Sequence, residues 1–157
     1  MNITFRPYEP DDKEILVNIL LSNCPKYFAQ EDKADFVFFL NTYADKNFLV
    51  VEREEAIIGC GGHYTKQERH GIAWVMFKSG SLGCMNLMLI ADKYYHEIET
   101  RILSEGKFFD IQIETTQLME KFLNRFGFET MAVKPEGFGE GLDQLFMRKS
   151  LAGRGSE

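Results

Sequence analysis

Residues 109–128 read FDIQIETTQLMEKFLNRFGF and pass from a strand pattern to a helical one. The first part, Phe109 to Glu114, has the short, apolar-rich pattern of a β-strand. The second part, Gln117 to Phe126, repeats apolar residues at helical spacing, and Gly127 is the residue type that most readily ends a helix. The apolar face of this helix consists of Met119, Phe122, Leu123 and Phe126. The stretch therefore predicts a strand followed closely by a helix.

The rest of the chain adds strands and helices on either side of this pair. Upstream, a strand and two helices precede three strands joined by short turns, and a long helical stripe follows them. The predicted strands are Ile3–Arg6, Phe48–Arg53, Ala56–Thr65, Gly71–Phe77, Phe109–Glu114, Glu129–Lys134 and Gln144–Lys149, and the predicted helices are Asp11–Ser22, Asp32–Tyr43, Met85–Ile102 and Gln117–Phe126. The order βααβββαβαββ predicts an α+β (mixed α/β) fold, with a mixed, mostly antiparallel central sheet and helices on both faces.

The composition is that of a folded domain. Of the 157 residues, 45% are apolar and 27% are charged, a globular balance. We expect a single domain over residues 1–150 and a flexible tail over residues 151–157. The apolar runs are too short to span a bilayer and the first residues lack a secretory pattern, so we expect no membrane partner and a cytoplasmic location. The net charge of −6 argues against broad binding to nucleic acids.

The cysteines and histidines show no ligand pattern. Three cysteines are an odd number without the close pairs typical of disulfide frameworks or zinc sites. The histidines also lack the spacing of metal ligands. These residues are Cys24, Cys60, Cys84, His63, His70 and His96. We therefore expect free thiols and no metal cofactor.

The element order and two motifs resemble the GNAT superfamily of N-acetyltransferases. The motifs are Ile113 to Gln117, at the end of a strand, and Phe122 to Phe128, a helix end with an aromatic residue and Gly-Phe. Only Leu123 departs from the family's aromatic pair. The resemblance covers Ile3 to Lys149. The Pro-Lys-Tyr-Phe segment at Pro25–Phe28 resembles a segment that a bacterial branch of the family carries between its first two helices.

The resemblance implies an enzyme that moves an acetyl group from acetyl-CoA directly to a primary amine of a small molecule or peptide. Acetyl-CoA would be a co-substrate, and a homodimer is left open. The alternative is an inactive GNAT-like binding or regulatory module that has lost coenzyme A binding.

The resemblance also implies that strands Gly71–Phe77 and Phe109–Glu114 splay apart to form a V-shaped cleft. The pantetheine arm would lie in the cleft and pair with backbone groups of Val75, Met76 and Phe77, as an added strand does.

The segment after this strand, Lys78 to Leu87, departs from the family's pyrophosphate loop, which carries small residues before a helix. In one alignment Met85 and Leu87 occupy the positions of those small residues and would crowd a phosphate. In the other, a cradle forms from Gly80, Ser81, Leu82 and Gly83, with Lys78 and Cys84 beside it. A flexible surface turn explains the same glycines. Gln117 and Leu123 complete the residues that the resemblance places near the coenzyme.

Three side chains are candidates for proton transfer. Glu114 and His63 are the candidate bases and Tyr64 is the candidate acid, because acetyl transfer needs a proton taken from an ammonium and one returned to a thiolate. Relatives carry a tyrosine donor at the position of Leu123. Each candidate also has a structural interpretation: a helix-start hydrogen bond for Glu114, a satisfied buried ring for His63 and packing for Tyr64. Proximity alone also supplies much of the rate of such reactions, and backbone N–H groups near Met76 could stabilise the oxyanion.

The acceptor is expected over the first two helices and the last hairpin. The candidate residues are Tyr27, Phe28, Glu136, Phe138, Glu140 and Asp143. A plain solvated loop over Lys134–Asp143 is the other interpretation of that segment.

Overall fold

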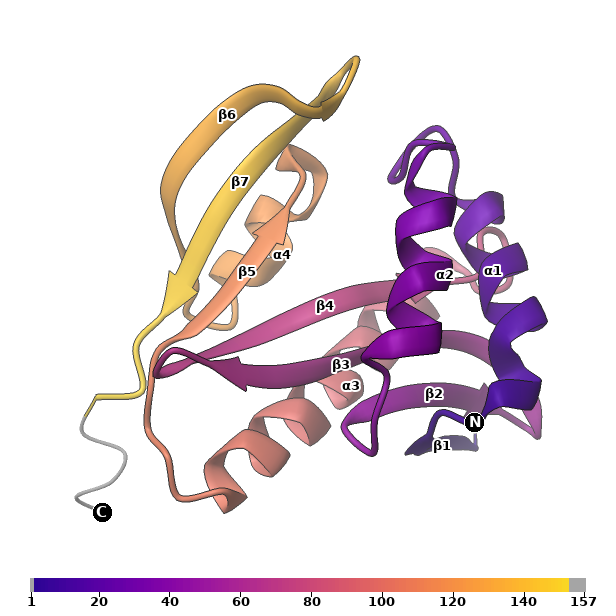
Figure 1. Cartoon of the computed structure of the whole chain (residues 1–157), viewed down its shortest axis with the longest axis horizontal. Coiled ribbons are helices and arrows are strands. Elements are labelled where there is room, and N and C mark those ends of the chain that lie inside the picture. Colours follow the sequence, from indigo (N-terminus) through magenta and orange to yellow (C-terminus); the bar gives the residue numbers. More distant parts are fainter. Residues whose placement is uncertain (1, 153–157) are drawn as a thin grey trace. The chain divides into compact units, whose positions relative to one another are not determined.

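The computed structural model describes residues 2–152, and Figure 1 draws their helices and strands. Among these residues, seven strands form one hydrogen-bonded sheet in the order β1-β2-β3-β4-β5-β7-β6. The elements are β1 (Ile3–Pro7), the 3-10 turn η1 (Pro10–Asp12), α1 (Lys13–Ser22), α2 (Asp32–Thr42), β2 (Phe48–Arg53), β3 (Ala56–Lys66), β4 (Arg69–Phe77), α3 (Cys84–Ser104), β5 (Ile111–Thr115), the 3-10 turn η2 (Gln117–Met119), α4 (Glu120–Asn124), β6 (Glu129–Gly139) and β7 (Leu142–Lys149). The predicted fold class and element order are confirmed. Strands β4 and β5 pair in parallel, whereas β1–β2, β2–β3, β5–β7 and β6–β7 are antiparallel.

The chain forms two compact units. The N-terminal unit contains the residues up to Gly62 together with Trp74–Arg101, and the C-terminal unit contains His63–Ala73 together with the residues from Ile102 onward. Leu151, the first residue of the expected tail, is fully buried. Residues 153–157 of that tail lie outside the described residues.

In the N-terminal unit, helices cover both faces of the strands (Figure 1). Alternate residues of β2 point to opposite faces. Phe48 and Val50 join the core beneath α1 and α2. On the other face, Tyr94 of α3 lies edge-on to the rings of Phe5 and Phe77. The core on the α1–α2 face consists of Leu16, Ile19, Leu20, Phe36, Leu40, Phe48, Val50, Cys60 and Met76.

Three glycines of β3 lie where other elements approach most closely. A Cβ atom on Gly59 would lie 2.6 Å from the carbonyl oxygen of Met76, and one on Gly62 would lie 2.7 Å from the Cα of Phe48. At Gly61 the same atom would overlap the Tyr94 hydroxyl. These contacts explain why β3 carries bare backbone at these positions.

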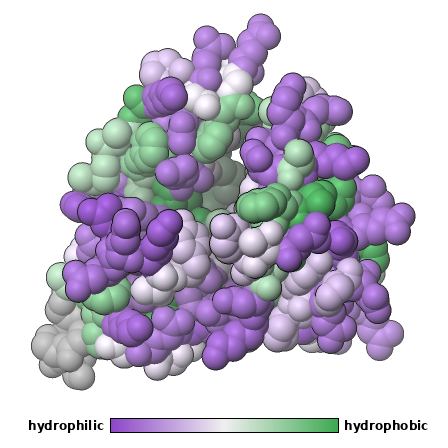
Figure 2. All heavy atoms as spheres, viewed as in Figure 1, coloured by the Kyte–Doolittle hydropathy of each residue, from purple (hydrophilic) through white to green (hydrophobic). Residues whose placement is uncertain are grey.

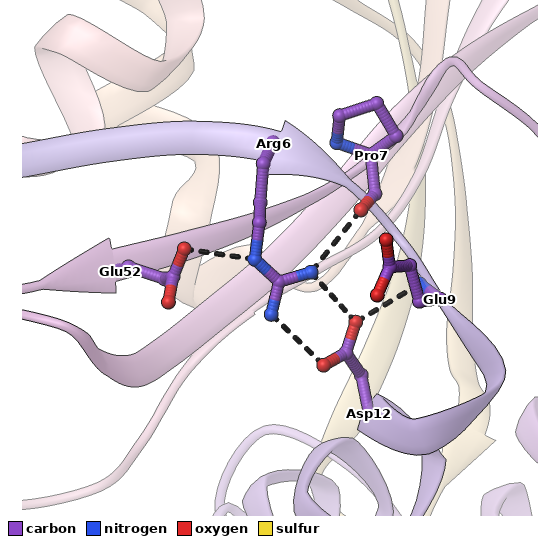
Figure 3. A network of polar contacts seen from close by, with 5 residues as sticks. All are labelled: Arg6, Pro7, Glu9, Asp12 and Glu52. Atoms are coloured by element: carbon purple, nitrogen blue, oxygen red, sulfur yellow. Dashed lines mark hydrogen bonds and ion pairs between the residues drawn. The ribbon is translucent and has the colours of Figure 1, made fainter.

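An ion-pair network holds β1 to the start of α1 (Figure 3). The Arg6 guanidinium donates to both carboxylate oxygens of Asp12, at 2.8 and 2.9 Å, and to Glu52 Oε1 at 2.8 Å. Asp12 Oδ2 also accepts the backbone N–H of Glu9 at 2.9 Å. The hydrogen bonds from Arg6 are the main reason why the pKa of Asp12 lies below its usual value, and Asp12 in turn raises the pKa of Arg6.

We expect Asp12→Asn to lower the free energy of unfolding at neutral pH by about 1 kcal/mol, a modest value because solvent screens the partly exposed Arg6. The folded pKa of Asp12 is lower than its unfolded value of about 3.9, so the stabilisation is present above that pH and is lost as the pH falls through the folded pKa. Urea unfolding of wild type and variant, from neutral pH down to about pH 3, should therefore show the difference shrinking with acid. A difference that stays constant over this range would contradict the assignment.

In the C-terminal unit, α4 packs behind β5 and β7 (Figure 1). Phe128, Leu145 and Met147 are among its buried residues. The predicted helix Gln117–Phe126 is wrong in part, because its first turn is η2 and the α-helical part spans Glu120–Asn124. The N–H of Met119 bonds the carbonyl three residues back, at Thr116, which tightens that first turn.

The predicted helix end at Gly127 is confirmed. Gly127 has a φ of +94°, its N–H bonds the carbonyl of Asn124, and the N–H of Phe128 bonds the carbonyl of Leu123. This pair of bonds closes the last turn of a helix when a glycine follows it.

The predicted loop Lys134–Asp143 is also wrong in part. Strand β6 continues to Gly139 and β7 begins at Leu142, with a register irregularity after Lys134. Side chains replace the missing ladder bonds, because Asp143 Oδ1 accepts the N–H of Glu136 and Glu136 Oε2 accepts the N–H of Gly141. The hairpin is therefore ordered almost to its tip.

Exposed apolar residues lie on α2 and on β6, and Figure 2 colours hydrophobic residues green. On α2 they include Phe38, 60% exposed, and on β6 they include Met131 and Val133. Within residues 2–152, no helix combines the length and apolar character needed to cross a membrane.

Candidate active site

The residue directly before the predicted pantetheine residues, Val75 to Phe77, has a strained backbone. Trp74 of β4 has a φ of +56°, in the left-handed region that bulky residues rarely adopt. Its ring packs against Phe28, Phe36 and Phe39, with centroid distances of 6.3, 5.0 and 6.2 Å. The thiol of Cys60 donates to its carbonyl oxygen at 3.4 Å. An aromatic cluster therefore holds β4 in this conformation.

The parallel pairing of β4 with β5 is short. The register contains three pairs, from His70 with Ile111 to Ile72 with Ile113. Within the described residues, no further pair between these strands follows Ile72. Pairing along the whole of both strands would have contradicted the predicted splay.

The predicted pantetheine residues differ in exposure. Val75 is 37% exposed, whereas Met76 is 4% exposed and belongs to the core. The side chain of Met76 is therefore out of reach of a ligand, and Met76 could contact one only through its backbone groups. The carbonyl of Phe77 accepts the Asn23 amide at 2.8 Å, and the same amide bonds the carbonyl of Ile19. Asn23 thus joins the end of α1 to the end of β4.

The loop after β4 is a compact turn. Ser81 donates to the carbonyl of Lys78 through its hydroxyl at 2.7 Å and its N–H at 3.2 Å. The N–H of Ser79 donates to the hydroxyl of Ser22 at 3.1 Å. Gly80 has a φ of +75° and a free space where a side chain would stand. Glycine is the residue type that adopts this conformation most easily.

Helix α3 begins directly after this turn. The N–H of Leu87 bonds the carbonyl of Gly83 at 2.9 Å, so Gly83 caps the helix and Cys84 is its first residue. The first N–H groups of a helix have no partner within it, and they can bind an anion. Met85 is 81% exposed and Leu87 is 37% exposed, and no atom lies within 4 Å of a Cβ built on Gly83. The side chain of Cys84 lies outside the described residues.

Of the candidate bases, His63 is enclosed. Its side chain is 1% exposed, and Nε2 lies 2.8 Å from Oε1 of Glu105. Because a carboxylate only accepts, Nε2 carries the proton, and the buried Nδ1 has no hydrogen-bond partner among the described residues.

His70 is a second buried histidine, and it is held from both sides. Nε2 donates to the carbonyl of Lys107 at 2.7 Å, so Nδ1 accepts the hydroxyl of Thr65 at 2.8 Å. His63 and His70 thus fix the chain between α3 and β5, which gives both a structural role.

Tyr64 and Glu114 occupy an open face of the C-terminal unit. Tyr64 is 52% exposed, and its ring lies over Gly71, where a Cβ would be 2.6 Å from Cε1. Partial burial, and then the negative charge of Glu114, raise the pKa of Tyr64. Glu114 is exposed, and its Oε2 accepts the amide of Gln144 at 3.1 Å.

No protein-family model matches the sequence, and no curated protein matches it. Solved structures do. Ard1 from Thermoplasma volcanium aligns over 96% of this chain and 98% of its own, with a TM-score of 0.75 and 14% identity. An acetyltransferase of the GNAT family from Staphylococcus aureus Mu50 aligns over 96% and 99%, with a TM-score of 0.72 and 16% identity. An aminoglycoside 6′-N-acetyltransferase complexed with coenzyme A aligns over 96% and 97%, with a TM-score of 0.69 and 14% identity. The chain has the GNAT fold. At these identities the likeness establishes the fold, and the bacterial branch stays a prediction.

Two residues that were predicted to lie near the coenzyme, Gln117 and Leu123, hydrogen-bond or pack within the protein itself. The Gln117 amide donates to the carbonyl of Gly141 at 2.8 Å and accepts the N–H of Asp143 at 2.9 Å, which ties the hairpin tip to η2. Leu123 is 7% exposed and lies in the core of the C-terminal unit. Their places near a coenzyme stay predictions.

The predicted acceptor residues fall into two separate groups. In the N-terminal unit, Phe28 stacks on Trp74, and the ring of Tyr27 lies 5.0 Å from the Lys26 ammonium. In the C-terminal unit, Glu136 and Asp143 bind backbone N–H groups of the hairpin, as described above. Glu140 is exposed at the hairpin tip and Phe138 is half-buried in β6.

Sequence reasoning missed Asn23 and Gln144. Nothing local marks either one, because each acts through a partner distant in the sequence, Phe77 and Glu114 respectively. No cluster of three His, Cys, Asp or Glu residues suited to a metal ion occurs between residues 2 and 152. Metal-independent activity stays a prediction, which treatment with a chelator would test.

Proposed function

We propose that the protein is an acetyl-CoA-dependent N-acetyltransferase that acts on a primary amine. The GNAT fold over 96% of the chain carries this proposal. It is supported by the strained Trp74, directly before the predicted pantetheine strand, and by the glycine turn that leads into the first turn of α3.

In this reaction the amine nitrogen forms a bond to the acetyl carbonyl carbon, and the bond from that carbon to the coenzyme A sulfur breaks. The ammonium loses a proton before attack, and the thiolate gains one. The proposed coenzyme residues are the backbone of Val75 to Phe77, the turn Lys78–Gly83, and the start of α3. Preorganised N–H groups there would stabilise the oxyanion and the pyrophosphate.

Glu114 and Tyr64 are more accessible for proton transfer than His63. Both are exposed, whereas the His63 ring is enclosed and bonded to Glu105. We therefore assign the basic role to Glu114 and the acidic role to Tyr64, with water able to relay protons.

A thermal-shift titration with acetyl-CoA tests the proposal. A ligand at about 100 times its Kd stabilises the folded state by about 2.7 kcal/mol, so the melting temperature should rise clearly. A thiol-reactive assay with a panel of primary amines should then detect release of coenzyme A. If acetyl-CoA does not bind and no coenzyme A is released, the proposal is overturned.

The second candidate function is a GNAT-like module without coenzyme A binding. The exposed Met85 and Leu87 at the start of α3 favour it, because bulky side chains there could obstruct a phosphate. The same titration separates the two functions, since the module predicts no shift.

Two substitutions at the start of α3 distinguish the alignments of the loop. If Gly80 to Gly83 form the cradle, Gly83→Val should weaken acetyl-CoA binding about tenfold, because a branched side chain blocks approach to the N–H groups. If Met85 crowds the phosphate, Met85→Gly should instead tighten binding. Isothermal titration of the three proteins, with circular dichroism as the folding control, measures both effects. Equal affinities would exclude a coenzyme site at this loop.

A further inference from the structure

Two side chains at the end of α1 hold the end of β4 and the turn that follows it. The amide of Asn23, which is 8% exposed, donates to the carbonyls of Ile19 and Phe77 at 2.9 and 2.8 Å. The hydroxyl of Ser22 donates to the same carbonyl of Ile19 at 2.6 Å and accepts the N–H of Ser79 at 3.1 Å. The end of one helix is thereby joined to both the last residue of a strand and the turn beyond it, all within the N-terminal unit.

The turn itself, residues 78–83, keeps part of its backbone open. The N–H groups of Lys78, Ser79 and Ser81 are bonded within the protein. The N–H groups of the turn that have no partner among residues 2–152 are those of Gly80, Leu82 and Gly83. Open N–H groups bind an anion well only when they are held in place before the anion arrives. The position of the turn therefore decides whether these groups can act together.

Ser22 is the anchor of this turn on α1. Within the described part of the chain, its hydroxyl is the one side-chain group of another element that bonds residues 78–83. Ser22 and Ser79 are both exposed, so water could bond the same N–H group in the absence of the hydroxyl. The hydrogen bond therefore contributes little to the stability of the fold, and its main effect is on the position of the turn.

We propose that Ser22 and Asn23 are positioning residues for acetyl-CoA. Asn23 fixes the end of the pantetheine strand, and Ser22 fixes the turn whose open N–H groups bind the pyrophosphate. This inference rests on the proposed function. A turn that is already ordered loses less conformational freedom when a ligand binds, so these side chains raise the affinity without contacting the coenzyme.

Substitutions of Ser22 separate this role from a purely structural one. Ser22→Ala should raise the Kd for acetyl-CoA about fivefold through loss of one hydrogen bond, while the melting temperature of the unliganded protein stays unchanged. Ser22→Thr keeps the hydroxyl and should restore the Kd to within about twofold of wild type. Asn23→Ala removes two hydrogen bonds and should raise the Kd about tenfold or more.

Lys13→Met is the matched control. It removes the hydrogen bond from Lys13 Nζ to Asn41 Oδ1, 2.8 Å long, at the opposite end of the same helix. This bond joins α1 to α2 and touches neither β4 nor the turn. The Kd for acetyl-CoA should therefore equal that of wild type.

Isothermal titration with acetyl-CoA measures these effects, and melting temperatures and circular dichroism report folding. The inference is overturned if Ser22→Ala binds acetyl-CoA as tightly as wild type, if threonine does not restore binding, or if Lys13→Met loses as much affinity. A loss in Ser22→Ala that accompanies a lower melting temperature would indicate a structural role and also overturn it. Should Asn23→Ala not fold, the two Ser22 variants decide alone. Absence of acetyl-CoA binding in wild type would instead overturn the proposed function itself.

Discussion

Gly62→Ala is expected to lower the free energy of unfolding by about 3 kcal/mol or to prevent folding, because overpacking against rigid atoms is among the costliest substitutions. The added methyl group would overlap the carbonyl oxygen of Asn47 and lie 2.7 Å from the Cα of Phe48. Both are backbone atoms of the segment that enters β2. No rotamer change can remove them from the path of the methyl group, so the β2–β3 ladder itself must shift.

Urea unfolding monitored by circular dichroism measures this effect. Gly83→Ala is the matched control, because no atom lies within 4 Å of a Cβ at Gly83, and its stability should fall by no more than about 1 kcal/mol, the cost of alanine at a helix N-cap. If the two variants unfold at the same urea concentration, the close approach at Gly62 is not as described.

Trp74→Ala is expected to cost about 3 kcal/mol, since truncating a large, partly buried aromatic residue that packs against the core loses both burial and packing. The ring contacts three aromatic side chains from the segment after α1 and from α2, so its loss leaves a void between these elements and β4. The backbone adds a second, more diagnostic effect. At a φ of +56° alanine keeps a steric cost of about 1–2 kcal/mol that glycine avoids.

Trp74→Gly should therefore be at least as stable as Trp74→Ala, although glycine in a strand normally loses about 0.5–1 kcal/mol to alanine. Val50 supplies the comparison, because it is a fully buried residue of β2 outside the left-handed region. There Val50→Gly should be less stable than Val50→Ala. Chemical denaturation of the four variants tests the reversal, and the same order at both positions would refute the strained backbone at Trp74.

Local patterns in the sequence were sufficient for the elements and their order. Alternation and helical spacing are properties of neighbouring residues, so the limits of β2 and nearly those of β3 and α2 follow from them. Gly127 is predictable for the same reason, since a helix end with positive φ favours glycine locally. The candidate acid and base on strands β3 and β5 were proposed from residue type and position, and their roles stay predictions.

Contacts between distant segments set the remaining features. The short first turn of the last helix and the long final hairpin depend on Gln117 and Asp143. Gln117 of η2 accepts the N–H of Asp143, and Asp143 accepts the N–H of Glu136 across the hairpin. The left-handed Trp74 is held by aromatic rings from the segment after α1 and from α2, and a tryptophan in the sequence gives no sign of this. The hydrogen bond from Gln144 to Glu114 joins residues thirty positions apart, and it exists because the β5–β7 register places them on one face. Register and burial are set by the packing of the whole chain, and short-range periodicity carries no information about which strands become neighbours.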